Sequence, residues 1–195
     1  MPEKTRLRRE ILARRDAEPG RPVRSRAIVE QLLELPAYGA AALISAFVGV
    51  GSEVDTLPFI ESALASGKRL AVPWVNGRTL RLFDLRNVGE LAPAPFGLLE
   101  PPPELRADPA RDVEPAEIDL FVVPGVAFDR HGGRLGHGRG YYDGLLARAR
   151  LDAAFVATAF DCQMVERVPM TARDVPIHAI VTESGTHWPR GLHSR

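Results

Sequence analysis

IDLFVVP, at residues 118–124, is the clearest candidate for a buried strand in this sequence of 195 residues, and the glycine-rich stretch GVAFDRHGGRLGHGRGYYD follows it at residues 125–143. A short apolar run bounded by turn residues is typical of a strand that is covered on both faces of a parallel sheet. A helical pattern begins at about Tyr141 and runs to about Arg150. Because open α/β sheets bind ligands in the crevice beyond the carboxyl ends of their strands, the glycine-rich stretch lies where a site is expected.

The rest of the chain alternates between strand-like and helix-like patterns. Further strands are expected at residues 42–48, 69–75, 79–85, 155–160 and 179–182, and further helices at residues 3–18, about 25–35 and about 55–66. A strand, a helix and a strand in that order predict a parallel pair joined by a right-handed crossover. The prediction is a single α/β domain over residues 1–195, with a mainly parallel central sheet flanked by helices. Residues 92–117, rich in proline and charge, are expected to form a surface loop that borders the site.

Composition argues against several classes of protein. The 25 basic and 25 acidic residues give no net charge, whereas a nucleic-acid-binding protein should carry a clear basic excess. No apolar run approaches the roughly 18 residues that a membrane-spanning helix requires. The single cysteine, Cys162, excludes an internal disulfide and is expected to be a small buried residue rather than a nucleophile. A cytoplasmic protein is therefore expected, with no nucleic-acid, membrane or obligate protein partner.

The glycine-rich stretch has the features of a phosphate cradle. Gly136, Gly138 and Gly140 alternate, which lets backbone N–H groups face an anion. Arg134 and Arg139 add fixed positive charge, and the N-terminal end of the following helix adds its dipole. The stretch lacks the GxxxxGK[ST] of a P-loop and the GxGxxG of a dinucleotide-binding fold, so the glycines alone leave a plain flexible loop as an alternative.

A longer pattern covers this stretch. Residues 124–143, PGVAFDRHGGRLGHGRGYYD, resemble the signature of the 5-formyltetrahydrofolate cyclo-ligase family, which is approximately PGxAFDxxGxRLGxGxGYYD. Other segments resemble the family in the same order along the chain: KTRLR at residues 4–8, SEVDT at 52–56, EP at 100–101, PMTARD at 169–174 and IVTE at 180–183. The resemblance thus extends from residue 4 to residue 183.

The resemblance implies an enzyme that closes 5-formyltetrahydrofolate to 5,10-methenyltetrahydrofolate, with ATP as co-substrate and Mg²⁺ as cofactor, and releases ADP and phosphate. In the family's chemistry, ATP phosphorylates the formyl oxygen and N10 of the same folate then attacks the formyl carbon. The implied sheet is similar to those of sugar-phosphate isomerases and CoA transferases. ATP binding would fall to Lys4, Arg8, Arg134, Gly136, Gly138, Arg139, Gly140, Tyr141 and Tyr142, with the basic N-terminal helix 3–18 contributing to that site. Folate binding would fall to Glu53, Gly138, Arg139, Gly140 and Tyr141, catalysis to Arg139, and magnesium binding to Asp143 and Asp174.

Some positions depart from the family pattern. His137 stands where many members have tyrosine, Gly144 where many have arginine, and His178 where aspartate is usual, so no role is carried over to these side chains. His131 is expected at the surface, and Trp74 is expected to serve in packing rather than in stacking on a pterin.

Structural interpretations of the candidate residues also remain open. The alternative for Glu53 is a solvated loop acid, for Asp143 an acid in the first turn of a helix and for Asp174 a turn residue. For the basic N-terminal helix the alternative is a solvated face. Two other functions also remain: a folate- or nucleotide-binding paralogue without catalysis, and a sugar-phosphate isomerase or acyl-transfer enzyme. The second would turn over without ATP.

Overall fold

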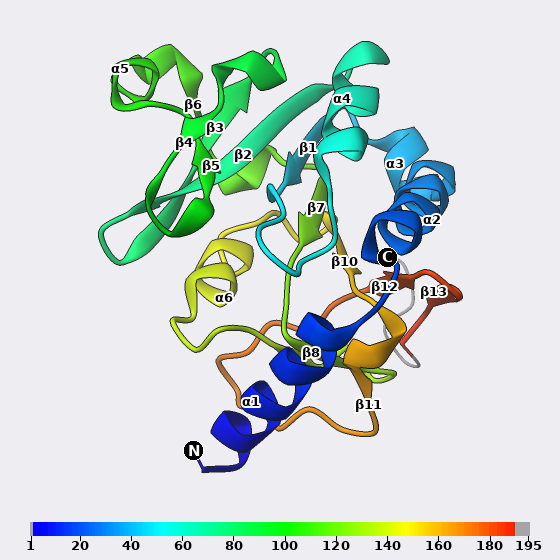
Figure 1. Ribbon diagram of the computed structural model, residues 1–195. Helices are drawn as coiled ribbons and strands as arrows, with labels where there is room; N and C mark the ends of the chain where they lie inside the picture. The colour runs from blue at the N-terminus through cyan, green and yellow to red at the C-terminus, as the bar shows by residue number, and fades with distance from the viewer. Residues whose placement is uncertain (1, 190–195) are drawn as a thin grey trace.

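Within residues 2–189, which the computed structural model describes, eight strands form one central sheet (Figure 1). Met1 and residues 190–195 of the expected domain lie outside the described residues. In spatial order the strands are β13 (Gly185–His187), β12 (Ala179–Thr182), β10 (Ala154–Thr158), β7 (Leu120–Val123), β1 (Leu43–Ala46), β2 (Arg69–Asn76), β3 (Thr79–Leu85) and β6 (Asp112–Val113). The helices are α1 (Pro2–Ala17), α2 (Arg21–Glu34), α3 (Pro36–Ala40), α4 (Leu57–Ala65), α5 (Pro103–Arg106) and α6 (Tyr141–Leu146).

The central five strands, from β12 to β2, are all parallel, and this confirms the expected α/β class. The remaining strands β13, β3 and β6 run antiparallel to their neighbours towards the two edges. From β1 the chain passes through α4 to β2 on one side, whereas from β7 it passes through α6 to β10 on the other side. The strand order therefore reverses between β1 and β7, which is where open α/β sheets bind their ligands.

Side chains alternate between the two faces of the sheet and pack into two cores. On one face Leu120 packs with Ile28 of α2 and Phe59 of α4, all fully buried. On the other face Phe121 packs with Leu145 of α6. Figure 1 shows α2 and α4 on one side of the strands and α6 on the other. Because both faces are covered, the central strands read as nearly continuous apolar runs.

A smaller sheet extends the fold beyond β7. It contains β11 (Met164–Val165), β8 (Ala127–Asp129) and β9 (Arg134–Leu135). α1 lies across it (Figure 1), and Ile11 of α1 packs there with Val168 in a third core. The buried carboxylate of Asp129 accepts hydrogen bonds from the backbone N–H groups of His131, Gly133 and Val168, at 2.7, 3.0 and 2.7 Å. These bonds fix the first half of the glycine-rich stretch.

Several element boundaries differ from the expected ones. α2 begins at Arg21 instead of near residue 25, because Pro22 in the first turn needs no N–H partner there. Pro36 follows the end of α2 but also begins the short helix α3. The helix that was expected to continue to about Arg150 ends at Leu146, and the following residues form turns closed by bonds between residues three apart.

Residues 92–117 contain more regular structure than the expected loop. They include β6, α5 and a two-stranded sheet of β4 (Ala92–Pro93) and β5 (Leu99–Glu100). Five 3₁₀ turns are also present among the described residues: Val88–Glu90, Pro95–Gly97, Pro109–Arg111, Pro115–Glu117 and Asp161–Gln163. None of the described helices is long and apolar enough to cross a membrane.

Candidate active site

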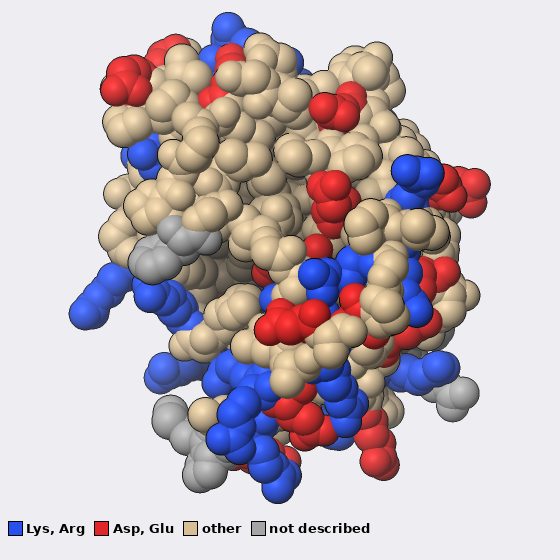
Figure 2. Space-filling model, in the orientation of Figure 1, with Lys and Arg blue, Asp and Glu red and all other residues tan. Residues whose placement is uncertain are grey.

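A cleft of about 1460 Å³ opens beyond the carboxyl ends of β1 and β7. In Figure 2 this face of the molecule is hollowed near its centre, and charged side chains gather below the hollow, around α1. Every residue assigned to a ligand from the sequence lines this cleft: Lys4, Arg8, Glu53, Arg134, Gly136, Gly138, Arg139, Gly140, Tyr141, Tyr142, Asp143 and Asp174. The fold thus gathers residues from distant parts of the chain into a single cavity.

Two glycines shape the loop between β9 and α6. Gly138 and Gly140 have φ angles of 99° and 69°, in the left-handed region that other residues rarely adopt. Gly138 also lies against α1, because a Cβ there would be 3.3 Å from Cζ of Arg8. Arg8 donates a hydrogen bond from Nε to the carbonyl oxygen of Gly136 at 2.7 Å. The loop therefore folds against α1, while its exposed glycines leave the backbone accessible to a ligand.

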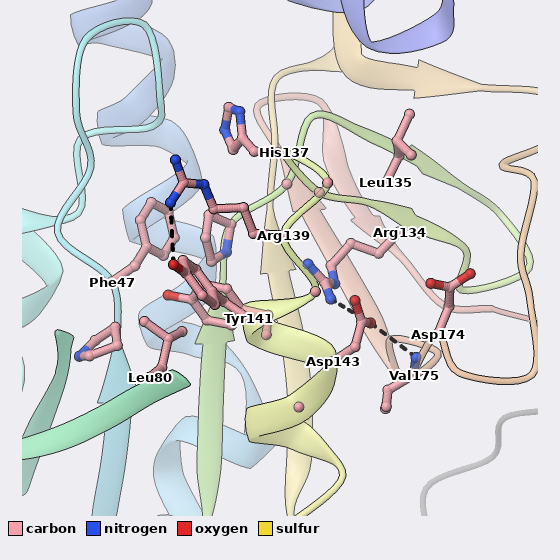
Figure 3. Close-up of a pocket in the computed structure, with 18 of the residues that line it drawn as sticks. Phe47, Leu80, Arg134, Leu135, His137, Arg139, Tyr141, Asp143, Asp174 and Val175 are labelled. Atoms are coloured by element: carbon pink, nitrogen blue, oxygen red, sulfur yellow. Dashed lines mark hydrogen bonds and ion pairs between the residues drawn. The ribbon is translucent and has the colours of Figure 1, made fainter. Parts of the chain in front are cut away.

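Arg134 orients Asp143. The Arg134 side chain is almost completely buried, and its Nη2 donates to Oδ1 of Asp143 at 2.7 Å. The same oxygen accepts the backbone N–H of Val175 at 3.2 Å (Figure 3). The resemblance assigned Arg134 to ATP binding, and in this structure its guanidinium holds the acid beside the loop.

Asp174 is held by α1. Its Oδ2 accepts hydrogen bonds from Nζ of Lys4 at 2.8 Å and from the backbone N–H and hydroxyl of Thr171 at 2.6 and 3.0 Å. Partial burial alone would raise the pKa of Asp174, but these hydrogen bonds outweigh burial and lower its pKa below the ordinary value. Asp174 is therefore a carboxylate at neutral pH, and Lys4 ties the first turns of α1 to residues 169–176.

The two acids fit a magnesium ion that is shared with phosphates. The hydrogen bonds described above fall on one oxygen of Asp143 and one oxygen of Asp174. The described residues contain no group of three or more acidic, histidine or cysteine side chains that could hold a metal by themselves. Mg²⁺ is commonly bound through one or two carboxylates together with substrate phosphates and water, so a pair of acids is sufficient.

Arg139 lies away from this acid pair. Its exposed guanidinium donates from Nη1 to the hydroxyl of Tyr141 at 3.3 Å, and that hydroxyl donates to the carbonyl oxygen of Gly77 in the β2–β3 hairpin, also at 3.3 Å. Figure 3 shows Arg139 pointing towards the side of the cleft where Phe47 lies, opposite to Asp143 and Asp174. The arginine expected to act in catalysis is therefore exposed and points away from the acid pair in this structure.

Glu53 lies in a tight loop after β1. The loop closes on Gly49, where a Cβ would be 2.1 Å from the carbonyl oxygen of Val54. Oε2 of Glu53 accepts the backbone N–H of Val50 at 3.2 Å, and Oε1 lies 3.5 Å from Nε2 of His137. The side chain of Glu53 is only 11% exposed, which excludes the solvated loop acid.

Sequence reasoning missed one residue beside Glu53. Arg15 of α1 is buried and its Nη1 lies 3.9 Å from Oε1 of Glu53. From the sequence, Arg15 was one of the basic residues of the N-terminal helix and had no role of its own. The signal that could have found it is an arginine two turns beyond Arg8, on a helix already assigned to the site.

An apolar wall faces the charged one. Phe47, Val48, Pro73, Leu80, Leu98 and Leu99 line it. Tyr142 also lines the cleft, and burial, with a smaller contribution from Glu53, raises the pKa of its phenol far above the ordinary value. Trp74 packs under Arg106, whose Cζ is 4.5 Å from the ring centre, as expected for a packing residue. The cleft thus has an apolar half and a cation-rich half, with the glycine loop between them.

Cys162 is not among the residues that line the cleft. Burial, followed by the influence of Glu18, raises the pKa of its thiol to about 12. The thiol is therefore protonated at neutral pH, which argues against a nucleophile, but Cys162 is half-buried and not the fully buried residue that was expected.

Comparisons with known proteins show the family of the chain. The model of the 5-formyltetrahydrofolate cyclo-ligase family matches residues 1–183. The chain is 35% identical over 181 residues to the mitochondrial 5-formyltetrahydrofolate cyclo-ligase of Arabidopsis thaliana, covering 82% of this chain and 65% of that protein, slightly under two thirds of its length. It is 32% identical over 159 residues to the 5-formyltetrahydrofolate cyclo-ligase of Escherichia coli K12, covering 79% and 85%.

Solved structures show the same architecture. The NMR structure of Aquifex aeolicus 5,10-methenyltetrahydrofolate synthetase superposes with a TM-score of 0.81 at 32% identity, covering 96% of this chain and 93% of that one. A 5,10-methenyltetrahydrofolate synthetase from Mycoplasma pneumoniae superposes with a TM-score of 0.73 at 22% identity, and this likeness speaks for the fold alone.

Proposed function

Because the chain belongs to the 5-formyltetrahydrofolate cyclo-ligase family, we propose that its cleft closes 5-formyltetrahydrofolate to 5,10-methenyltetrahydrofolate in an ATP-dependent reaction. The observation that carries the proposal is the two-sided cleft, in which an apolar wall faces lysine, arginine and aspartate side chains across one glycine loop. A reaction that transfers a phosphoryl group from a nucleotide to the formyl group of a pterin requires both surfaces within reach of each other.

The nucleotide phosphates fit the charged half. Lys4, Arg8 and the exposed backbone of the glycine loop supply donors and positive charge there, and α6 begins immediately after the loop. Mg²⁺, held by Asp143 and Asp174 together with the phosphates, would neutralise charge on the transferring phosphoryl group. Lys4 forms an ion pair with Asp174 in this structure. It would therefore have to change partner when the nucleotide and Mg²⁺ bind.

The pteridine fits the apolar half. Phe47 and Leu80 provide a surface for its ring (Figure 3). Glu53 also lines the cleft, and its Oε1 lies 3.5 Å from Nε2 of His137. A carboxylate that accepts hydrogen bonds from ring and amino N–H groups fixes both the position and the orientation of a ring. Tyr141, which reaches Gly77 across the cleft, would cover the ring from the side of the loop.

The proposed chemistry needs no nucleophile from the protein. An N-formyl group is an amide, so its carbon is a poor electrophile and its oxygen a poor leaving group. Transfer of the γ-phosphoryl group to the formyl oxygen releases ADP and turns that oxygen into part of a good leaving group. The N10 lone pair then attacks the formyl carbon, the C–O bond breaks with departure of phosphate, and the N10 proton leaves. The protein aligns the reactants and compensates charge, and Arg139 is the cation proposed to meet the phosphoryl group.

The test is formation of product by the purified chain. Near-ultraviolet absorbance should report 5,10-methenyltetrahydrofolate when 5-formyltetrahydrofolate, ATP and Mg²⁺ are all present. No absorbance should develop when any one of them is left out. Binding of both ligands without product would instead indicate a non-catalytic paralogue, and product without ATP would exclude a cyclo-ligase.

A further inference from the structure

Arg15 has buried contacts that the proposed reaction does not yet use. Its side chain is 6% exposed, whereas arginine is rarely buried without a charged partner. Nε donates to the hydroxyl of Ser52 at 3.0 Å, and Nη1 donates to the carbonyl oxygen of Gly125 at 3.5 Å and lies 3.9 Å from Oε1 of Glu53. One guanidinium therefore contacts the segments that follow both central strands, β1 and β7.

The surroundings of Glu53 indicate what Arg15 supplies. Oε2 is occupied by the backbone N–H of Val50, so Oε1 is the oxygen available to a ligand. Two cationic or potentially cationic groups face Oε1: the buried Arg15 and, at 3.5 Å, His137, whose side chain is 56% exposed. Burial of a carboxylate away from water costs free energy unless an opposite charge lies close to it. His137 is exposed and can move away from an entering ligand, whereas Arg15 is fixed.

We propose that Arg15 is a positioning residue for folate recognition, which compensates and orients the Glu53 carboxylate so that Oε1 is presented to the N–H donors of the pteridine. This inference rests on the proposed function, because it takes Glu53 as a folate contact. Arg15 is not among the residues that line the cleft, so its effect on the ligand passes through Glu53. The effect is confined to one half of the cleft, since Lys4 and Arg8 face the other half.

A purely structural role for Arg15 predicts a different pattern. Arg15 and Asp16 both bind the hydroxyl of Ser52, at 3.0 and 2.5 Å, and could serve only to close the loop after β1. Loss of that clamp would disturb the loop whether or not Glu53 carries a charge. If Arg15 acts by charge compensation, by contrast, its loss should have little effect once Glu53 has been replaced by a neutral residue. Comparison of Arg15 variants in the presence and absence of the Glu53 charge therefore separates the two roles.

The experiment is a double-mutant cycle read by calorimetry of 5-formyltetrahydrofolate and ATP binding. Arg15→Gln should raise the Kd for the folate by about tenfold, a smaller loss than removal of one partner of a hydrogen-bonded buried charge pair, because Arg15 and Glu53 are 3.9 Å apart. It should change the Kd for ATP by less than about twofold. In a Glu53→Gln background the same substitution should change the folate Kd by less than about twofold. Arg15→Lys should raise the folate Kd by only about threefold, because the charge remains without the forked donors.

Arg14→Gln is the matched control. Arg14 is the neighbouring residue of α1, is exposed, and pairs with Glu10 on the helix surface, so its loss should leave both Kd values unchanged. Thermal unfolding of each variant reports its folding. Should Arg15→Gln not fold, Arg15→Lys takes its place in the cycle, with an expected loss of about threefold that disappears in the Glu53→Gln background.

Two results would overturn the inference. One is an unchanged folate Kd in folded Arg15→Gln, and the other is an undiminished loss in the Glu53→Gln background, which would make Arg15 a loop clamp. Failure of the unmodified chain to bind 5-formyltetrahydrofolate would contradict the proposed function itself, and the cycle distinguishes the two cases.

Discussion

Arg139 combines an exposed position with the forked donors of a guanidinium. It follows Gly138 and precedes Gly140, both in the left-handed region, and its guanidinium contacts the hydroxyl of Tyr141. The acid pair Asp143 and Asp174 lies on the other side of the loop (Figure 3). For Arg139 to meet a transferring phosphoryl group, its side chain must therefore leave Tyr141 and turn across the loop.

Replacement of Arg139 should affect turnover more than binding. Charge is redistributed on the phosphoryl group during transfer, so a cation that arrives with the nucleotide stabilises the transition state more than it stabilises bound ATP. Arg139→Ala should lower kcat by roughly 10²–10³, and Arg139→Lys should retain part of the rate because charge remains without the forked donors. Steady-state kinetics and ATP calorimetry measure the two effects. Near-normal kcat with weak ATP binding would assign Arg139 to anchoring instead.

The acid pair gives a second prediction, on metal dependence. Asp143→Asn and Asp174→Asn should each raise the Mg²⁺ concentration for half-maximal rate by about tenfold or more, since loss of even a partner that orients a metal ligand costs about 10–100-fold in affinity. Asp152→Asn is the control, because its side chain is 70% exposed and pairs with Arg150. Unchanged magnesium dependence in both acid variants would make these residues structural.

At the level of elements, α1 is the part of the fold that reaches both halves of the cleft. Lys4 and Arg8 in its first turns contact Asp174 and the glycine loop, and Arg15 near its end contacts Glu53. Ile11, between them, is fully buried on the smaller sheet. The helix is therefore held by packing at its middle. It presents Lys4 and Arg8 to the cleft directly and reaches the folate side only through the contact of Arg15 with Glu53.

The role of α1 is tested by two double variants, each of which removes two positive charges from the helix. Lys4→Ala with Arg8→Ala should raise the Kd for ATP by tenfold or more, since one hydrogen bond to a charged group contributes about 1.5–3 kcal/mol. Arg6→Ala with Arg9→Ala removes the same charge from exposed positions and should leave the Kd nearly unchanged. Calorimetry with both ligands should show normal folate binding in each. Equal loss of ATP affinity in the two variants would make α1 a general basic surface.

The sequence predicted buried elements well and the edges of the fold less well. β3 and β12 have the expected bounds, because the alternating pattern of β3 and the short apolar run of β12 are each bounded by polar and turn residues. α6 ends early and the edge strands β6 and β13 were not expected, since two- and three-residue strands form only where a neighbouring strand offers its backbone. Sequence periodicity carries no information about such a neighbour.

For the whole molecule, the reversal of strand order between β1 and β7 explains why one cavity gathers the predicted residues. The loop after β1 brings Glu53 and the loop after β7 brings the glycine stretch, and the parallel pairing of these strands places both at one edge. The position of the site followed from sequence because these segments directly follow buried strands. The pairing of Arg134 with Asp143, and of Arg15 with Glu53, depends on side-chain packing that a sequence does not encode locally.

The central claim is that ATP activates the formyl oxygen. The most direct measurement follows that atom, with ¹⁸O placed in the formyl group of 5-formyltetrahydrofolate and the released phosphate examined by mass spectrometry. If the phosphoryl group is transferred to the formyl oxygen and leaves with it, each phosphate released with 5,10-methenyltetrahydrofolate carries one ¹⁸O. Unlabelled phosphate, with the label recovered in water, would contradict the account.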